Sequence, residues 1–575
     1  LDWSYDLLPE HEQHTFRRLA VFAGRFDLAA AHAIMSPDET QPVSLTVLAL
    51  NELTDKSLVV TDTAGEESQY HLLEPIRQYA EQRLVEAHEA LDAHMRHARW
   101  YAALSERADA TLWTAEHESA LALLEANRAN VRAALGWWLR DPEGAEHGLR
   151  HAQSLWQYWI FRGALAEGRS WLERLSALAP RFSGERANAL LCAVGLDFRL
   201  ATFSSESTHA MVREAVEITR MVGDAAGAGR ALRFQGMLAY LEGDVRRAKA
   251  SFHESLDLAR EAGEPSGECL ALHSLGMTAL LYGNLREAHA YLDRSLHVVR
   301  REEGRVWRVI APMNPPGMPL TATASRIDNV SEETWILLRS VDRAVVEGYI
   351  LAHLGSLARC QGDFAAARSL QEEARLILER EDDREGMAQV SGQLGNLARV
   401  EGDFAAAYAH LRESLRLRRT LGDRRGIVVA LNNLGMLAAD EGNYARARAL
   451  YARSYADALK YGDASALELV LMLQARLAFI RNDFRLAQEL SNQLFDMMRT
   501  SSSLYYGVAI HGWLAEAALK QSDREAARAS YSACLADLER LGDEGAASMI
   551  RALLAGIGTS GGDSGEIALP ADSGA

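Results

Sequence analysis

Histidines are the first residues to consider for chemistry, because the chain has 18 of them. His94 and His97 lie three residues apart, so on a helix both imidazoles could face one metal ion. No HExxH motif accompanies them, and Asp92 is the only carboxylate close by in the sequence. This pattern favours a solvated helix face over a metal site, and we expect no bound metal.

Nucleotide or hydrolytic chemistry would need a local motif of its own. A phosphate-cradling GxxxxGK[ST] loop occurs nowhere in the chain, and the glycine-rich stretches 223–229 and 422–426 lack its lysine. The GxSxG turn that exposes a nucleophilic serine is also missing. We therefore expect neither a cofactor nor an enzymatic activity, and we expect the chain to bind a partner instead.

The overall charge argues against nucleic acid as that partner. The 575 residues include 61 Lys plus Arg and 79 Asp plus Glu, for a formal net charge of −18. Proteins that bind DNA on their own usually present a basic stripe, because phosphate neutralisation supplies much of the affinity. No apolar run reaches the ~20 residues that span a bilayer. We expect neither nucleic acid nor a membrane to bind these residues directly.

The cysteines indicate a reducing compartment. They lie far apart and form no CxxC pair, at Cys192, Cys269, Cys360 and Cys534. A disulfide framework and a zinc site are therefore both disfavoured. Reduced thiols are typical of the cytoplasm, where we expect the protein to work. The chain begins at Leu1, inside what reads as ongoing domain sequence, so we expect it to be part of a longer protein.

A repeat of about forty residues must position any binding residue. A small residue recurs at the same place in seven segments, and an alanine follows it twelve residues later in each. The small residues are Gly236, Gly276, Gly355, Gly395, Gly435, Ala475 and Ala515. Their successive spacings are 40, 79, 40, 40, 40 and 40, which indicates a tandem array.

Each repeat reads as a pair of helices. The small residue lets the two helices approach closely, and a turn such as Gly402-Asp403 separates them. Glycine takes the left-handed conformation that ends the first helix, and the aspartate caps the second helix. Later copies have Asn482-Asp483 and Ser522-Asp523 at this turn. Asparagine tolerates the left-handed conformation, so we expect the same turn to form at Asn482.

These segments resemble the tetratricopeptide repeat in its longer, forty-residue form, over about 190–556. The resemblance implies an all-α, right-handed superhelical solenoid whose first helices line a concave groove. Inward-facing positions are then expected three before, one after and four after the small residue. The predicted groove residues are Arg233, Tyr240, His273, Ser356, Arg359, Asn396, Arg399, Asn432 and Arg476.

Two of these arginines, Arg359 and Arg399, occupy equivalent places one repeat apart. Arginines at this spacing could clamp an acidic peptide or a carboxylate ligand through charge-assisted hydrogen bonds. The alternative is that each arginine bridges to a neighbouring acid such as Glu401. The groove is expected to hold a protein, a peptide or a small inducer.

One stretch, 304–345, interrupts the repeat. It has nearly the length of one repeat, because Gly276 and Gly355 lie 79 residues apart. Two readings stay open, a loop that folds over the groove and a degenerate repeat. Four prolines exclude a regular helix there, Pro312, Pro315, Pro316 and Pro319.

The first 85 residues do not repeat and have a winged-helix layout. Residues 10–26 read as an amphipathic helix that ends at Gly24, and a short helix starting at Asp27 and a third helix at 43–58 follow. Residues 57–73 read as a β-hairpin around Ala64-Gly65. The third helix carries one lysine and no arginine, so we do not expect it to read DNA.

Residues 86–190 read as a helical connector that contains seven of the eleven tryptophans. Trp156 and Trp159 lie three residues apart, on one face of a helix. A box for an aromatic ligand is possible there. Buried core between irregular helices is the more typical use of such residues, and we expect it here.

The segments LDWSYDLLPEHEQHTF, LNELTDKSLVV, YHLLEPIRQYAEQRL and NRANVRAALGWWL follow one another in this order. In that order they resemble bacterial STAND-type signalling ATPases, which include large LuxR-type transcriptional regulators. The resemblance implies a nucleotide-binding core before the winged helix and a tetratricopeptide-repeat sensor after it. The position of the family's Met-His-Asp motif reads Leu72-Leu73-Glu74, so no nucleotide contact carries over.

The resemblance implies a sensor whose groove binds a partner and whose winged helix relays occupancy to a nucleotide-binding domain upstream. A freestanding scaffold for protein assembly is the alternative, and the missing phosphate loop disfavours an ATPase in its own right. The expected domains are a winged helix (1–85), a Trp-rich connector (86–190), repeats (191–303 and 346–556), the insert (304–345) and a disordered tail (557–575).

Overall fold

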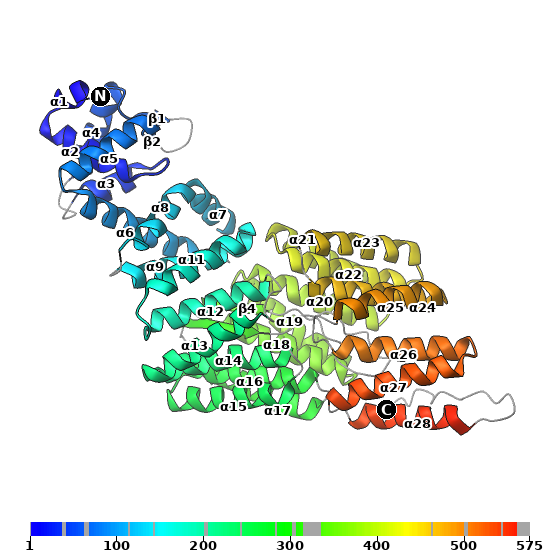
Figure 1. The fold of residues 1–575 in the computed structure, drawn as a ribbon. Helices are drawn as coiled ribbons and strands as arrows, with labels where there is room; N and C mark the ends of the chain where they lie inside the picture. The colour runs from blue at the N-terminus through cyan, green and yellow to red at the C-terminus, as the bar shows by residue number, and fades with distance from the viewer. Residues whose placement is uncertain are drawn as a thin grey trace. The chain divides into compact units, whose positions relative to one another are not determined.

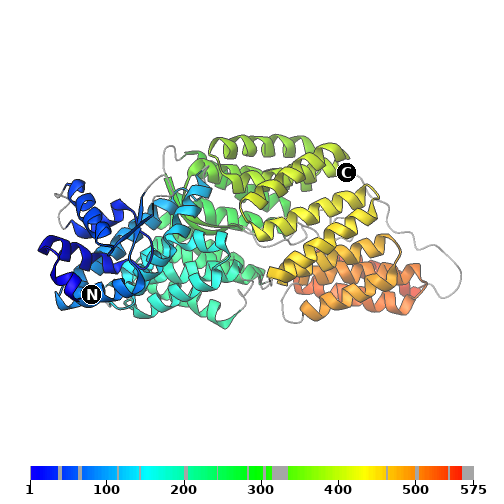
Figure 2. The same cartoon turned by 90° about the horizontal axis from the view of Figure 1, so that it is seen from above.

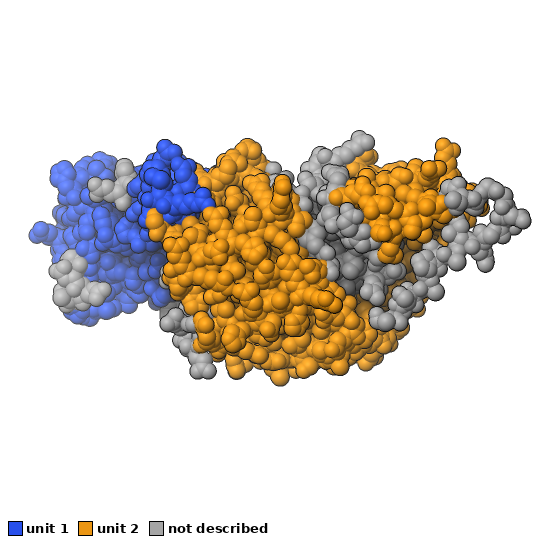
Figure 3. Space-filling model, turned by 90° about the horizontal axis from the view of Figure 1, so that it is seen from below, with its two compact units in different colours: residues 1–196, 217–222 blue, residues 197–216, 223–575 orange. Residues whose placement is uncertain are grey.

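The computed structural model describes most of the chain. The described residues are 2–36, 42–62, 68–112, 116–141, 144–199, 205–241, 244–281, 284–301, 306–313, 335–461, 464–498, 504–541 and 544–559. They form two compact units, shown in Figure 3, one of residues 1–196 and 217–222 and one of residues 197–216 and 223–575. The expected hairpin tip Ala64-Gly65 and the expected tail beyond 559 lie outside the described residues.

The first unit opens with the predicted winged helix. Its elements are α1 (Asp2–Asp6), α2 (Glu10–Arg18), the 3₁₀ turn η1 (Leu19–Val21), α3 (Leu28–Met35), α4 (Val43–Asp55), β1 (Val60–Asp62), β2 (Gln69–His71) and α5 (Glu74–Glu86). The two strands pair antiparallel, with Thr61 opposite Tyr70. Asp27 caps α3 by accepting a hydrogen bond from the amide of Ala30 at 2.7 Å, as predicted.

The end of α2 differs from the prediction. The helix ends at Arg18 and the chain passes through η1, so it does not continue to Gly24. The segment after η1 instead pairs with residues distant in sequence. The Asn130 side chain accepts a hydrogen bond from the amide of Ala23 at 2.8 Å and donates one to the carbonyl of Arg25 at 2.7 Å. Phe26 then forms a β-bridge with Tyr70 through two backbone hydrogen bonds of 2.9 and 2.8 Å.

The connector consists of short helices with an aromatic core. They are α6 (Ala90–Asp109), α7 (His117–Ala126), α8 (Arg128–Trp138), α9 (Ala145–Ser154), α10 (Trp156–Arg162), α11 (Leu165–Leu178) and α12 (Gly184–Arg199). Trp156 and Trp159 are 1% and 2% exposed, and the Trp156 indole donates a hydrogen bond to the carbonyl of Cys192 at 2.8 Å. These two tryptophans are therefore core residues, as expected.

Helix pairs form the second unit, stacked one on the next in Figures 1 and 2. From α14 to α26 the even-numbered helices are the first helices of the repeats, and the odd-numbered helices are the second. The helices are α13 (Glu206–Met221), α14 (Ala225–Leu241), α15 (Val245–Glu261), α16 (Pro265–Leu281), α17 (Leu285–Arg301), α18 (Arg343–Cys360), α19 (Phe364–Arg380), α20 (Arg384–Val400), α21 (Phe404–Thr420), α22 (Arg424–Asp440), α23 (Tyr444–Tyr461), α24 (Ala464–Ile480), α25 (Phe484–Met498), α26 (Leu504–Lys520), α27 (Arg524–Leu541) and α28 (Glu544–Thr559).

The turns inside the repeats have the predicted chemistry. Gly402 has φ of 82°, and the Asp403 carboxylate accepts a hydrogen bond from the amide of Ala406 at 3.0 Å. The later copies keep this conformation without glycine, with φ of 58° at Asn482 and 62° at Ser522. The prediction that Asn482 adopts the left-handed conformation is confirmed.

The small residue of each first helix allows close helix packing, as predicted. A Cβ atom at Gly395 would lie 2.6 Å from Cγ of Leu411, and one at Gly435 would lie 2.4 Å from the Tyr451 ring. On the second helix, the repeated alanine is fully buried at Ala407. No larger side chain fits between the paired helices at these points.

The insert contains an antiparallel pair of strands, β3 (Val306–Met313) and β4 (Trp335–Asp342). Residues 314–334 between them lie outside the described part. Helix α18 packs directly on α17, as α20 packs on α19. The helix pairs before and after the insert are therefore neighbours in the array, and the insert takes no place in the helical stack.

Two further expectations concern the whole chain. In the part of the chain that the structure describes, no helix combines the length and the apolar character needed to cross a membrane. All four cysteines lie within the described ranges, and none of them forms a disulfide.

Candidate functional site

The candidate site is the face of the repeat array that the first helices α14, α16, α18, α20, α22 and α24 form, which we call the first-helix face. The nine residues predicted to line the groove all lie on these helices. Arg476 is partly exposed. The other eight are buried, each 8% exposed or less: Arg233, Tyr240, His273, Ser356, Arg359, Asn396, Arg399 and Asn432.

Two histidines and a glutamine connect three successive first helices. Nε2 of His273 on α16 lies 2.9 Å from Nδ1 of His353 on α18. Nε2 of His353 lies 3.3 Å from the amide nitrogen of Gln389 on α20. That nitrogen can only donate, so Nε2 of His353 accepts and the proton of the neutral ring lies on Nδ1. His353 therefore accepts a hydrogen bond from Gln389 and donates one to His273.

Burial keeps both histidines neutral. Desolvation lowers the pKa of His273 to about 4. The pKa of His353 lies well below its usual value for the same reason, and a charge on His273 would lower it further. A proton on either ring would therefore have to enter a dry site where its positive charge finds no compensating acid.

Buried carboxamides without partners lie on the next first helices. Neither the oxygen nor the nitrogen of the Gln393 side chain on α20 has a hydrogen-bond partner, and the same holds for Asn432 on α22. The side-chain oxygens of Gln389 and Asn433 also have none. These residues are at most 5% exposed. A buried amide without a partner costs about 1–3 kcal/mol, so these groups can gain free energy from a ligand that pairs with them.

The prediction missed His353, Gln393 and Asn433, although the sequence contains their signal. Each of them lies two residues before the small residue of its repeat, and they follow one another at intervals of 40 residues. The prediction counted the positions three before, one after and four after the small residue, so it did not include this one.

Arg399 forms an ion pair with Asp440, which lies at the end of the next first helix. Its side chain is only 2% exposed, whereas that of Asp440 is 33% exposed. Glu401, the acid first considered for such a bridge, pairs with Arg368 instead. Arg399 thus bridges to an acid of the next repeat, and a ligand carboxylate would have to compete with Asp440.

Arg233 is the most enclosed cation of the first-helix face. Burial lowers the pKa of its guanidinium to about 10, and Nη1 lies 3.4 Å from the Ser255 hydroxyl. Its Nε has no hydrogen-bond partner. An acceptor placed here would gain a charge-assisted hydrogen bond in a dry environment.

The histidines considered for metal binding have separate partners. Nε2 of His94 lies 2.9 Å from a carboxylate oxygen of Glu81, and the ring of His94 stacks on Trp137. His97 is buried beside Phe22 and Tyr101, and burial lowers its pKa to about 3. The two rings therefore do not converge on one point.

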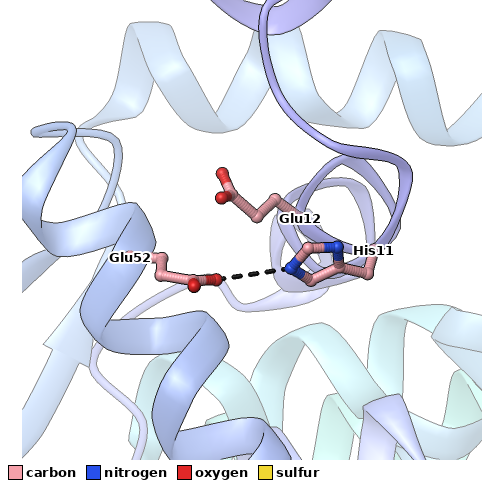
Figure 4. A group of neighbouring side chains, drawn as sticks. All are labelled: His11, Glu12 and Glu52. Atoms are coloured by element: carbon pink, nitrogen blue, oxygen red, sulfur yellow. Dashed lines mark hydrogen bonds and ion pairs between the residues drawn. The ribbon is translucent and has the colours of Figure 1, made fainter.

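His11, Glu12 and Glu52 form the group of described residues that could hold a metal ion (Figure 4). The His11 imidazole lies 3.4 Å from the Glu52 carboxylate. Glu12 is 3% exposed, and both of its oxygens contact the ammonium group of Lys56. The lysine supplies the positive charge that the buried carboxylate needs, so this group is explained without a metal.

The first unit also contains a cavity of about 930 Å³ between the winged helix and α6, lined in part by Asp27, His32 and Trp100. Arg96 is its cation, and this guanidinium already contacts Asp92 at 2.9 Å and the carbonyl of Ser36 at 3.1 Å. The cavity is a weaker candidate than the first-helix face, because its charge is already compensated.

The comparisons with known proteins assign two parts of the chain. The model of the winged helix-turn-helix domain matches residues 8–85, and the model of the tetratricopeptide repeat matches residues 348–420. A candidate HTH-type transcriptional regulator of Mycobacterium bovis is 38% identical over 240 residues, which are 40% of this chain and 27% of that protein. A Mycobacterium tuberculosis regulator described in the same words has the same values. The match thus spans about a quarter of the length of these relatives.

Two solved structures show a similar helical architecture at low identity. One is a STAND protein with a tetratricopeptide-repeat sensor from Pyrococcus horikoshii, with 13% identity and a TM-score of 0.37 over 81% of this chain and 66% of that one. The other is a Rap protein in complex with the competence and sporulation factor, with 12% identity and a TM-score of 0.43 over 69% of this chain and 99% of that one. At these values neither structure informs on a ligand of this chain.

Proposed function

Because a winged helix-turn-helix domain and tetratricopeptide repeats occur together in this chain, we propose that it is the sensing part of a larger transcriptional regulator. In this proposal the first-helix face binds a polypeptide partner, and the chain itself catalyses no reaction. The winged helix passes the bound state to a nucleotide-binding domain of the STAND type that precedes it in the protein. The protein works in the cytoplasm.

The strongest support comes from the buried carboxamides of Gln393 and Asn432, which have no partners in the protein. A carboxamide offers N–H donors and a carbonyl acceptor, the same groups that a peptide backbone offers. An extended polypeptide can therefore both donate hydrogen bonds to these side chains and accept hydrogen bonds from them. The first-helix face accordingly favours a protein or peptide over a purely apolar inducer.

The exposed face of α4 supports contact with protein rather than with DNA. Val43, Leu45 and Leu48 are 46–52% exposed on this helix. Lys56, just beyond its end, pairs with Glu12. Leu73, at the position of the family's motif histidine, is 52% exposed. Exposed apolar residues of this kind mark protein contacts, and here they fit a neighbouring domain of the same regulator.

Binding can act as a signal only if the partner favours one arrangement of the protein over another. The bridge from Arg399 to Asp440 and the hydrogen bonds from His273 to Gln389 each join neighbouring first helices. A ligand that forms hydrogen bonds with these helices changes the stability of the contacts between them. We propose that this change is what the winged helix relays.

The coding sequence that precedes Leu1 tests the relay. We expect a phosphate loop within about 300 residues upstream, roughly the length of two domains. A start codon directly before Leu1, with no such loop, would reject the regulator and leave a freestanding scaffold. This test requires only the gene sequence, and its result does not depend on which partner binds the repeats.

A further inference from the structure

The strands β3 and β4 form a hairpin that the helical stack does not require. Eight residue pairs join them, from Val306 opposite Asp342 to Met313 opposite Trp335. Helix α17 ends at Arg301 and α18 begins at Arg343, and the two helices pack directly on each other. His273 and His353 are also in hydrogen-bond contact across this junction. The insert therefore leaves the array at the end of α17 and rejoins it at the start of the next helix, α18.

The hairpin lies on the first helices. Strand β3 contacts α14 and α16, and β4 leads directly into α18. These three helices belong to successive repeats of the same unit, so the hairpin crosses the array on the first-helix face. A hairpin that packed on the second helices or projected into solvent would leave this face open.

The first helices are buried along most of their length. On α16 all residues from Cys269 to Leu280 are buried, and on α18 all residues from Ala344 to Arg359 are buried except Glu347. The first helices α20 and α22 are buried in the same way, so the neighbouring helices account for much of this burial and the strand contacts identify where the hairpin lies. The second helix α19 shows the usual pattern, because its buried residues are confined to Ala367, Gln371, Ala374 and Leu378.

Exposure at one equivalent place of the first-helix face changes along the array. Asn396, Met436 and Arg476 occupy the same place in three successive repeats. The first two are 8% and 2% exposed, whereas Arg476 on α24 is partly exposed. This place is thus buried on α20 and α22 and partly exposed on α24.

We infer that the β3–β4 hairpin is a resident occupant of the partner-binding face, held there as part of the same chain. This inference deepens the proposed function, because it names a segment that a partner must displace. A tethered occupant acts at an effective concentration in the millimolar range for short flexible tethers. The apparent affinity of a partner falls by the fraction of molecules in which the face is free.

Replacement of the hairpin tests this inference without a known partner. In the variant, residues 306–342 are exchanged for a Gly/Ser segment of the same length, which keeps the connection from α17 to α18 without imposing structure. Hydrogen exchange is followed by mass spectrometry in the whole chain and in the variant. We expect the amides of α14, α16 and α18 to exchange roughly tenfold faster in the variant, because local opening no longer has to release the hairpin.

Helix α24 is the matched control, since it is a first helix of a later repeat in the same array. Its exchange should be the same in both proteins. Equal exchange of α14, α16 and α18 in the two proteins would overturn the inference. Faster exchange of α24 together with the other helices would overturn it as well, because the insert would then stabilise the array as a whole.

A second measurement adds the hairpin back as a separate molecule. A synthetic peptide of residues 306–342, added to the variant, should restore slow exchange on α14, α16 and α18, and a peptide of scrambled order should not. Equal protection by both peptides would contradict specific docking. These results concern the hairpin alone, so their failure would leave the proposed regulator and its upstream test unaffected.

Discussion

Lowering the pH from 7.5 to 5 is expected to remove about 4 kcal/mol of unfolding free energy through His273 and His353 together. Both are fully buried, and their pKa values are lowered in the folded protein, to about 4 for His273 and well below the usual value for His353. In the unfolded chain a histidine takes up a proton near pH 6.5. Each ring therefore costs about 2 kcal/mol at pH 5, where only the unfolded state is protonated.

The sign follows from the direction of these pKa shifts. Because the folded protein binds fewer protons than the unfolded chain, its stability is complete above about pH 6.5 and falls as the pH drops toward 4. Urea denaturation at pH 7.5 and pH 5, followed by helical circular dichroism, measures the loss. Carboxylates titrate mainly below this range, so they contribute little to it.

The chain supplies its own control for this experiment. Gln393 and Asn433 occupy the place of His353 in the following repeats, and Asn432 occupies the place of His273, so a carboxamide is compatible with both positions. The double variant His273→Gln with His353→Gln should show about 4 kcal/mol less pH dependence than the original protein. If the double variant lost the same free energy between pH 7.5 and 5, the buried pair would not be its source.

Replacing Gly395 by alanine is expected to lower the free energy of unfolding by about 2 kcal/mol, as overpacking of a dense core usually does. The new Cβ would lie 2.6 Å from Cγ of Leu411 and 3.2 Å from its backbone nitrogen. The side chain could shift, but the backbone of α21 would have to move away from α20. Urea denaturation at pH 7.5 measures the effect.

Gly392 is the matched control, because it lies one turn earlier on the same helix. A Cβ atom there would meet only the Ser414 hydroxyl, at an ordinary contact distance of 3.4 Å. Alanine favours a helix over glycine by up to about 1 kcal/mol, so Gly392→Ala should be neutral or slightly stabilising. Equal destabilisation by both substitutions would mean that close packing is not why Gly395 is needed.

The architecture of the repeats could be predicted from the sequence because it depends on local chemistry. Left-handed residues such as Gly402 and caps such as Asp403 act within one turn, and their effect does not depend on the rest of the fold. The same logic holds for the cap at Asp27 and for the hairpin of the winged helix. Motifs of this kind appear in the sequence at the place where they act.

The parts that could not be predicted depend on contacts between distant residues. After α2 the chain pairs with distant residues, Ala23 and Arg25 with Asn130 and Phe26 with Tyr70, 44 residues away. A hairpin from the insert lies over the first helices α14 and α16, which are distant from it in the sequence. His353 was missed because the positions counted from the small residue did not include the one two residues before it. Neither the pairing nor the cover leaves a periodic signal in the sequence.

Site-specific photo-crosslinking tests whether the partner binds on the first-helix face. A photoreactive amino acid is placed at Arg476 on the first helix α24 in one variant and at the exposed Asn492 on the second helix α25 in another. Each variant is irradiated in cells that express the whole protein. We expect a covalent adduct of defined mass from position 476 and none from position 492. An adduct from position 492 alone, or equal adducts from both, would contradict this expectation.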